Sequence, residues 1–343
     1  MNRYIKNIHI NKVRHLKDIN ISLEKDAYPH LMITGKNGSG KTSLLNAIAD
    51  HIERIANDTY KEFENLGEVT VSFEDIYSLI RRHQEGNFIL AFYEAHRTIK
   101  KLREPKTPTK PTLRRRSKIK DSLTSQFLNF LAHFKIQEAL ARNEELEIDA
   151  NQIREWFVNF EKLLGEIFQD KDLKLAFNYK DYSFKIVTAG KEFKFTELSD
   201  GFAAVLDIVV DLILKMQKKN QLIRVYECDG IVLVDEIETH LHLELQKVIM
   251  PLLTEIFPNI QFIVTTHSPF VLSSLSNAVA FDLEHQEIIE DLTEYSYESL
   301  AEGYFGVRTA SSYMGMQLGR LEELLKKETL SLSEKTELKD LIC

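Results

Sequence analysis

The alternation of apolar and polar positions along the chain predicts an α/β fold. Apolar residues alternate with polar ones through residues 3–34, which predicts strands, the last of them a short apolar run that ends at Gly35. Apolar residues at helical spacing follow from residue 44 to residue 55. Further along, the pattern predicts a buried strand over Phe88–Tyr93, helices within 122–168, strands within 173–196, an apolar helix over 202–216, and two central strands of a parallel sheet over 231–234 and 262–265.

The first candidate binding site is the loop between the strand that ends at residue 34 and the helix that follows. Residues 35–42 read Gly-Lys-Asn-Gly-Ser-Gly-Lys-Thr, which fits the phosphate-loop pattern GxxxxGK[ST]. Glycines let such a loop curl around a triphosphate with its backbone N–H groups turned inward, and the next helix points its positive end at the phosphates. Lys41 can reach the β- and γ-phosphate oxygens, and the Thr42 hydroxyl can bind Mg²⁺. The strand before and the amphipathic helix after favour this interpretation over a plain glycine-rich turn.

Three further segments place polar residues where a nucleotide would need them. Asp235 and Glu236 follow the first central strand; Asp235 suits the Mg²⁺ shell, and Glu236 suits deprotonating the attacking water. His267 follows the second central strand and could hydrogen-bond the γ-phosphate, although it could also simply cap a turn before proline. Ser199 and Gly201 precede the apolar helix and offer a second helix N-terminus to phosphate, with ordinary N-capping by Ser199 as the alternative.

Composition excludes several classes of protein. The 343 residues are 43% hydrophobic and 28% charged, with 7 Pro and 13 Gly, which is typical of a globular chain and not of collagen or a disordered protein. The most apolar stretch, 202–214, is interrupted by Asp207 and Asp211, so we expect no membrane span. The N-terminus lacks the apolar core of a secretory signal, and Cys228 and Cys343 make no disulfide or metal framework, so we expect a cytoplasmic protein.

Positive charge is concentrated in one segment. The net charge is −8, yet Arg97 to Lys120 hold eleven Lys or Arg and a single acid, Glu104. Three prolines within this segment predict an extended loop. It could contact the phosphates of DNA or RNA, dock on an acidic partner or neighbouring subunit, or be a solvated loop. It contains no aromatic residue, so base stacking is not indicated.

Together, these motifs resemble those of the ABC-type ATPases, in the branch shared by SMC, RecF and OLD proteins and by stand-alone ATPases of bacterial anti-phage systems such as Septu and retrons. Residues 198–202 (LSDGF) stand where the family has its LSGGQ signature. Residues 234–242 (VDEIETHLH) correspond to the acidic Walker B motif and the loop after it. Residues 265–270 (TTHSPF) correspond to the segment that carries the switch histidine. The resemblance covers residues 1–60 and 183–275 and leaves out the middle of the chain.

The resemblance implies an ABC-type P-loop head with a mixed central sheet and a helical insertion, or lid, between the phosphate loop (Walker A) and the signature. It also implies that ATP is sandwiched between two subunits, so that the protein is a homodimer or a higher oligomer. Lys41, Glu236 and His267 would be catalytic, and Thr42 and Asp235 would bind Mg²⁺. The residues that would bind ATP are Gly35, Asn37, Gly38, Ser39, Gly40, Lys41 and Thr42 of one subunit and Ser199 and Gly201 of its neighbour.

Two positions depart from the family pattern. Asp200 replaces the first signature glycine, and its charge would repel phosphate, so we expect its side chain to point away. Phe202 replaces the signature glutamine. The family also has a glutamine-bearing loop, for which Gln84 and Gln126 are both poor candidates.

A His-x-His pair offers a further candidate chemistry. His240 and His242, with Glu238 nearby, could bind a transition metal. The resemblance instead places this segment at the dimer interface beside the nucleotide, and we favour that interpretation.

The chain is predicted to have four parts. Residues 1–75 hold the N-terminal strands and the Walker A part of the ATPase core, 76–172 the basic loop and helical insertion, 173–290 the signature, Walker B and switch-histidine part of the core, and 291–343 a C-terminal helical tail. Apolar stripes in the insertion lack sustained heptads, which favours a compact lid over an SMC-type coiled-coil arm. A leucine stripe in the tail is expected to pack on its own domain.

The predicted function is that of a Mg-ATP-binding and hydrolysing ATPase that dimerises around nucleotide and regulates a partner effector, a nuclease or toxin, in a bacterial anti-phage module. The residues after His267 are too few for an OLD-type nuclease domain, so any cutting is expected from another chain. The alternative is a RecF- or SMC-like repair or maintenance ATPase that binds duplex DNA through the basic segment. A scaffold that binds nucleotide without hydrolysing it and a transporter ATPase are further alternatives.

Overall fold

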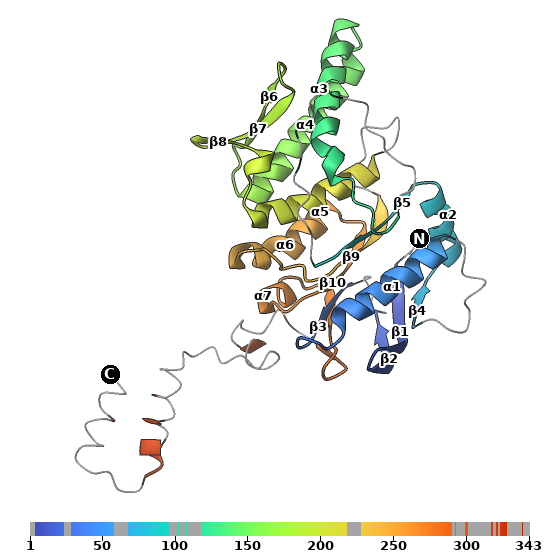
Figure 1. Ribbon diagram of the computed structural model, residues 1–343, viewed down its shortest axis with the longest axis vertical. Helices are drawn as coiled ribbons and strands as arrows, with labels where there is room; N and C mark the ends of the chain where they lie inside the picture. Colours follow the sequence, from blue (N-terminus) through green and yellow to red (C-terminus); the bar gives the residue numbers. More distant parts are fainter. Residues whose placement is uncertain are drawn as a thin grey trace. The chain divides into compact units, whose positions relative to one another are not determined.

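A six-stranded sheet contains the three strands that precede the phosphate loop, Asp235 and His267 (Figure 1). In the computed structural model its order is β12-β11-β3-β10-β9-β5, and every neighbouring pair is parallel except β11 and β12. Parallel pairing places the carboxyl ends of five strands at one edge of the sheet. The bounds are His30–Thr34 for β3, Phe88–Tyr93 for β5, Asp229–Val234 for β9, Ile260–Thr265 for β10, Ala278–Asp282 for β11 and Glu287–Ile289 for β12.

The structure describes most of the chain. The described residues are 4–23, 29–57, 68–95, 118–217 and 228–289, with short pieces at 102, 104, 108, 292, 299–300, 317, 320–321, 323–327 and 338. Met1–Glu294 form one compact unit and Tyr295–Cys343 a second. In the second unit, Leu324 is fully buried and Leu325 is exposed, whereas Leu318 lies outside the described residues.

A second, antiparallel sheet covers one side of the first unit. Its order is β2-β1-β4, and its inward-facing residues share one core cluster with β3 and with helix α1. Because α1 contacts strands of both sheets, it fixes the phosphate loop between them. The bounds are Ile5–Val13 for β1, Leu16–Ser22 for β2, Val69–Phe73 for β4, Lys41–Ala56 for α1 and Ile76–Gln84 for α2.

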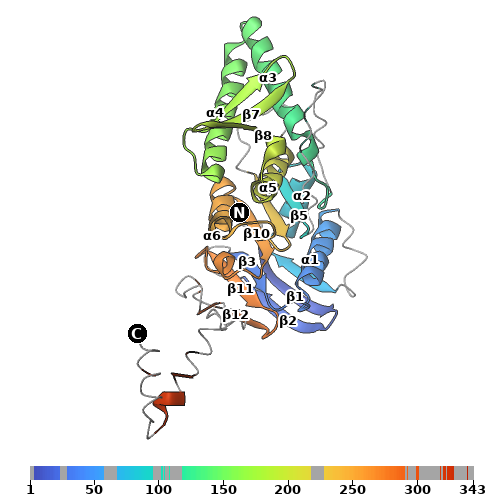
Figure 2. The same cartoon turned by 60° about the vertical axis from the view of Figure 1, so that its left-hand side comes forward.

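The predicted helical insertion is a pair of helices, α3 (Phe127–Asn143) and α4 (Glu147–Phe168), that lie side by side (Figure 2). Their aromatic residues pack into each other; the Trp156 ring, for example, lies 5.5 Å from Phe130 and 5.3 Å from Phe160. The chain turns between the helices at Glu145, which has a positive φ of 59°. The apolar stripes therefore close on each other within one compact hairpin, and the predicted α/β fold with a mixed sheet and a helical insertion is confirmed.

A small antiparallel sheet, β6-β7-β8, follows the helical pair and leads into the signature region. The Phe184 ring of β7 stacks on Phe157 of α4, with ring centroids 6.1 Å apart. At the start of α5, Phe202 stacks on Phe168 at 4.5 Å, so the residue that replaces the family glutamine packs against the end of α4. The bounds are Lys174–Asn178 for β6, Ser183–Thr188 for β7, Lys191–Lys194 for β8, and Asp200–Met216 for α5.

The elements do not follow the four predicted parts of the chain in every place. β5 lies within the predicted insertion, 76–172, yet it is an edge strand of the six-stranded sheet. The small β6-β7-β8 sheet lies within 173–290, yet it packs on the insertion helices. Two further helices follow the strands that carry the predicted site: α6 (Leu243–Ile256) follows β9, and α7 (Pro269–Leu272) follows β10.

Candidate functional site

The phosphate loop joins β3 to α1 at the carboxyl edge of the six-stranded sheet. Gly35, Gly38 and Gly40 have φ angles of 134°, 86° and 97°, which side chains rarely adopt, and these angles let the loop curl. A Cβ atom at Gly35 would lie 2.9 Å from the Ser39 hydroxyl oxygen. Helix α1 begins directly after Gly40 without a side-chain cap, so its first backbone N–H groups point to a place where an anion would fit.

Lys41 folds back into this loop. Its ammonium group donates hydrogen bonds to the carbonyl oxygens of Gly35 (2.8 Å) and Lys36 (3.1 Å), which a phosphate oxygen could replace as acceptors. Burial lowers the pKa of Lys41, and four nearby carboxylates act in the opposite direction. These carboxylates belong to Glu236, Glu238, Asp235 and Asp282.

Strand β9 delivers Asp235 and Glu236 to the same edge. Asp235 is buried, and its backbone N–H donates to the Tyr93 carbonyl oxygen on β5 (2.8 Å). Glu236 is half-buried and has a φ of 45°, in the left-handed region that few residues other than glycine adopt. The hydroxyl of Thr265 lies between them: it donates to Asp235 Oδ1 (2.6 Å) and accepts from the Glu236 backbone N–H (2.7 Å).

Strand β10 delivers His267 beside these acids. Its backbone N–H donates to a carboxylate oxygen of Glu238 at 2.5 Å. Burial lowers the pKa of His267 and the charge of Lys41 lowers it further, whereas Glu236 and Asp235 act in the opposite direction; the net lowering favours the neutral ring. Burial raises the pKa of Glu238. The turn that follows is capped by the Ser268 hydroxyl, which accepts from the backbone N–H of Val271, and not by His267.

The signature segment has a different setting at the start of α5. Ser199 is the N-cap residue, but its side chain makes no capping hydrogen bond and is exposed, as is Asp200. Gly201 is buried beneath the backbone of the loop after Walker B, where a Cβ atom would lie 3.0 Å from the His240 carbonyl oxygen. Ordinary capping by the Ser199 side chain, the plainer alternative, is absent at this helix.

The structure brings four of the predicted residues together. The charges of Lys41, Glu236 and Asp235 all act on the pKa of His267. Among the described residues, no hydrogen bond or ion pair joins Ser199 or Gly201 to this group. In the phosphate loop, Asn37, Gly38 and Thr42 are exposed, whereas Ser39 and Gly40 are half-buried.

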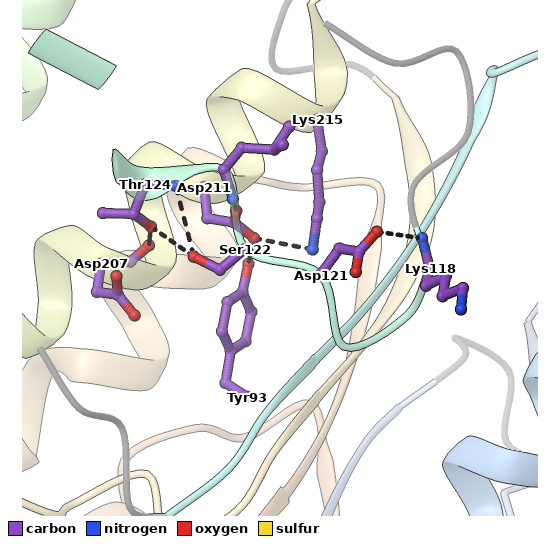
Figure 3. A network of polar contacts seen from close by, with 9 residues as sticks. Tyr93, Lys118, Asp121, Ser122, Thr124, Asp207, Asp211 and Lys215 are labelled. Atoms are coloured by element: carbon purple, nitrogen blue, oxygen red, sulfur yellow. Dashed lines mark hydrogen bonds and ion pairs between the residues drawn. The ribbon is translucent and has the colours of Figure 1, made fainter. Parts of the chain in front are cut away.

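A buried network links the signature helix to the main sheet (Figure 3). Asp211 of α5 accepts hydrogen bonds from the Tyr93 hydroxyl (2.7 Å) and the Leu123 backbone N–H (2.5 Å), and it pairs with Lys215 (2.9 Å). The Asp211 side chain is fully buried, and that of Lys215 is 2% exposed. Because the Tyr93 carbonyl also accepts from Asp235, one residue connects the signature helix with Walker B.

The end of the basic segment attaches next to the phosphate-loop helix. Ile119 is buried; its carbonyl accepts from the Phe92 backbone N–H (2.8 Å), and its own N–H donates to Glu53 of α1 (3.3 Å). Lys120 donates to Asn46 of α1 at 2.8 Å. Arg97 and most of the other basic residues of this segment lie outside the described residues.

The available donors fit Mg²⁺ and a triphosphate. The Thr42 hydroxyl and the Asp235 carboxylate are the hard oxygen ligands that Mg²⁺ prefers, and phosphate oxygens and waters would have to supply the rest. Within the described ranges, the Ser39 hydroxyl is buried without a hydrogen-bond partner, as expected of a cradle for a polar ligand. The same ranges contain no group of three or more His, Cys, Asp or Glu residues that could hold a metal ion, and His240 and His242 are exposed.

Some residues of this site were not predicted. Thr265 lies within the switch-histidine motif, which predicts no role for it; its only signal in the sequence is a polar side chain at the end of an apolar strand. Tyr93 has no local signal, because its hydroxyl partner is 118 positions away in the sequence. Gln84 is exposed at the end of α2 and Gln126 lies in the turn before α3, so the family's glutamine-bearing loop stays unassigned.

A phosphate loop, an acidic strand end and a histidine-bearing strand end at one edge of this mixed sheet define a P-loop ATPase. The chain belongs to the family described as "AAA domain, putative AbiEii toxin, Type IV TA system", whose model matches residues 31–273. Among the described residues, none of the helices is both long and apolar enough to cross a membrane.

Two relatives agree with the predicted resemblance. The chain is 27% identical to the Septu protein PtuA of Bacillus mycoides (strain KBAB4), over 99% of this chain and 50% of the relative. It is 24% identical to the Retron Vc95 probable ATPase of Vibrio cholerae serotype O1 biovar El Tor, over 89% of this chain and 78% of the relative. The chain therefore spans about half the length of the Septu relative.

Solved structures include a similar head domain. An SMC head bound to the C-terminal winged-helix domain of ScpA is 12% identical, with a TM-score of 0.46, over 84% of this chain and 97% of that one.

Proposed function

We propose that this chain binds Mg-ATP and hydrolyses it within a homodimer or higher oligomer that closes around the nucleotide. The observation that carries the proposal is the convergence of Lys41, Asp235, Glu236 and His267 beside the phosphate loop at one edge of the sheet. Each of these side chains suits a separate need of phosphoryl transfer to water: charge neutralisation, metal support, proton removal and sensing of the γ-phosphate.

The proposed roles follow from the surroundings of each side chain. Lys41 exchanges its loop carbonyl partners for β- and γ-phosphate oxygens. Thr42 and Asp235 hold Mg²⁺, which neutralises charge on those oxygens when it is bound. Glu236 positions the attacking water and removes its proton, and the neutral His267 donates a hydrogen bond to the γ-phosphate.

The proposed dimer rests on the setting of the signature. Ser199 and Asp200 are exposed at the start of α5, and the Ser199 hydroxyl is not used as a cap, so this helix start is accessible to the phosphate of a neighbouring subunit. Each protomer would thus supply the phosphate loop to one nucleotide and the signature to the other.

We also propose that nucleotide-driven closure regulates a partner effector, a nuclease or toxin, in an anti-phage module. The similarity to the Septu protein and to a retron-associated probable ATPase supports this role. The alternative is an ATPase that binds duplex DNA through the basic segment in repair or maintenance; we keep it second because both relatives support the first role. A cytoplasmic location remains a prediction from the sequence.

Replacement of Glu236 by Gln tests hydrolysis and assembly together. Glu236→Gln should lower ATP turnover by roughly 100-fold or more, because the amide cannot accept the proton of the attacking water. The variant should still bind ATP and accumulate as a closed oligomer, which native mass spectrometry with and without Mg-ATP detects.

Glu244→Gln, an exposed change on α6, is the matched control and should leave turnover and assembly unchanged. Undiminished hydrolysis in Glu236→Gln would contradict the role given to this residue. A wild-type chain that binds Mg-ATP but never hydrolyses it would instead favour the scaffold alternative.

A further inference from the structure

The Thr265 hydroxyl makes hydrogen bonds to both acidic residues of Walker B. It is fully buried on β10, between β9, which carries the acids, and β3, which carries the phosphate loop. Its hydroxyl donates to Asp235 Oδ1 (2.6 Å) and accepts from the Glu236 backbone N–H (2.7 Å). Building on the proposed hydrolysis, we propose that Thr265 is a positioning residue that orients both the metal-binding carboxylate and the water-activating one.

The direction of these hydrogen bonds fixes the orientation of Asp235. A hydroxyl has one proton, and an amide N–H can only donate, so the Thr265 proton must point to the carboxylate. The backbone of Asp235 is already held by Tyr93, which leaves rotation of the carboxyl group as its main freedom. The hydrogen bond to Oδ1 restrains that rotation, and the other carboxylate oxygen would then be the one to bind a cation.

The same threonine stabilises the unusual backbone of Glu236. At a φ of 45°, this residue occupies a conformation that side chains disfavour, and such conformations persist only when their surroundings hold them. Thr265 supplies two of the restraints: its hydroxyl accepts from the Glu236 N–H, and its carbonyl accepts from the Ile237 N–H (3.1 Å). The turn so held sets the direction in which the Glu236 carboxylate leaves the strand.

A role limited to folding would predict something different. A buried β-branched residue suits a central strand, so valine would serve equally well if only packing mattered. Within the Thr265 side chain, the hydroxyl makes the hydrogen bonds to Asp235 and Glu236 and the methyl group cannot, so the proposal predicts that function depends on the oxygen atom and not on the shape of the side chain.

Four variants separate these roles. Thr265→Ser keeps the hydroxyl and loses the methyl group. Thr265→Ala loses both groups, and Thr265→Val replaces the hydroxyl with a methyl group of similar size. Thr254→Val is the control, because that hydroxyl on α6 bonds only to carbonyl oxygens of its own helix. ATP turnover, KM for ATP, the Mg²⁺ concentration for half-maximal ATP binding, and thermal unfolding are measured for each.

We expect Thr265→Ala and Thr265→Val to lower kcat and to weaken Mg²⁺-dependent ATP binding by roughly 10- to 100-fold, while Thr265→Ser stays close to wild type. Equal kcat and equal Mg²⁺ dependence in the serine and alanine variants would overturn the proposal. Loss of folding in both variants without a hydroxyl would overturn it too, in favour of a structural role. If the wild-type chain shows no hydrolysis, the proposed function fails, and the Mg²⁺ dependence of ATP binding still decides the role of Thr265.

Discussion

Gly35 occupies a position where one added carbon atom would collide with the phosphate loop itself. Its φ is 134°, and a Cβ atom would lie 2.9 Å from the Ser39 hydroxyl oxygen. We expect Gly35→Ala to weaken ATP binding by about tenfold or more, because the loop must open to relieve strain of about 1–2 kcal/mol. Titration with a fluorescent ATP analogue measures this change.

Gly190 provides the matched control for the backbone strain. Its φ of 88° is also positive, but a Cβ atom there would meet nothing within 4 Å, and it lies in the β7–β8 turn, away from the phosphate loop. Gly190→Ala should therefore lower the free energy of unfolding by about 1 kcal/mol and leave ATP affinity unchanged. The same affinity in both variants would mean that Gly35 contributes to folding alone.

Site residues could be located from the sequence where their signal is local. The phosphate loop is a contiguous pattern, Asp235 follows an apolar run directly, and His267 follows one after two threonines. The part played by Thr265 could not be predicted in this way, because it depends on β9 and β10 being neighbours and on the orientation of one hydroxyl. Burial of Gly201 beneath the His240 carbonyl is equally non-local.

Elements with a strong internal pattern could be predicted, and those that depend on partners could not. Strand β5 and helix α1 have uninterrupted apolar patterns that match their periods. Helix α6 has buried residues at helical spacing, but Pro251 in its interior conceals the pattern. The short strands β11 and β12 exist through pairing, and no local rule assigns β1, β2 and β4 to a separate sheet.

The buried network around Asp211 makes a prediction for helix α5. Asp211→Asn removes the charge opposite Lys215, whose side chain is 2% exposed. We expect the free energy of unfolding to fall by about 3 kcal/mol or more, because an ammonium group is then left buried without its counter-ion. Urea denaturation followed by circular dichroism measures the loss.

Glu192→Gln is the control for charge removal in general. It breaks the exposed Lys185–Glu192 pair of the small sheet, which should cost less than about 1 kcal/mol. An equally small effect for Asp211→Asn would show that the network does not hold α5 in place.

At the scale of the whole molecule, buried histidines tie stability to pH. His30 is buried at the start of β3, where its Nδ1 accepts from the Phe262 N–H (3.0 Å), and burial lowers its pKa to about 4. Below pH 6.5 the unfolded chain takes up a proton that the folded chain refuses, so stability is complete above that pH and falls as the pH decreases toward 4. Between pH 7 and pH 5 His30 alone should cost about 2 kcal/mol.

His30→Gln should remove this part of the pH dependence, because glutamine can still accept from Phe262 but does not titrate in this range. Urea denaturation at pH 7 and pH 5 compares the variant with wild type. His285 is the opposite case: its hydrogen bond with Asp282 raises its pKa, so His285→Gln should increase the loss at pH 5. An unchanged pH dependence in His30→Gln would show that this ring takes up its proton without cost in the folded chain.

The position of Tyr93 has a consequence for the cycle proposed above. This residue holds Asp235 through its backbone and α5 through its hydroxyl. The strand edge that would bind one ATP and the helix that would face the other are therefore expected to move as a single rigid body. If these two elements do not bend relative to each other, one nucleotide pocket is expected to open by release of the neighbouring subunit. An effector would then sense the spacing of the two subunits and not a change in the shape of either.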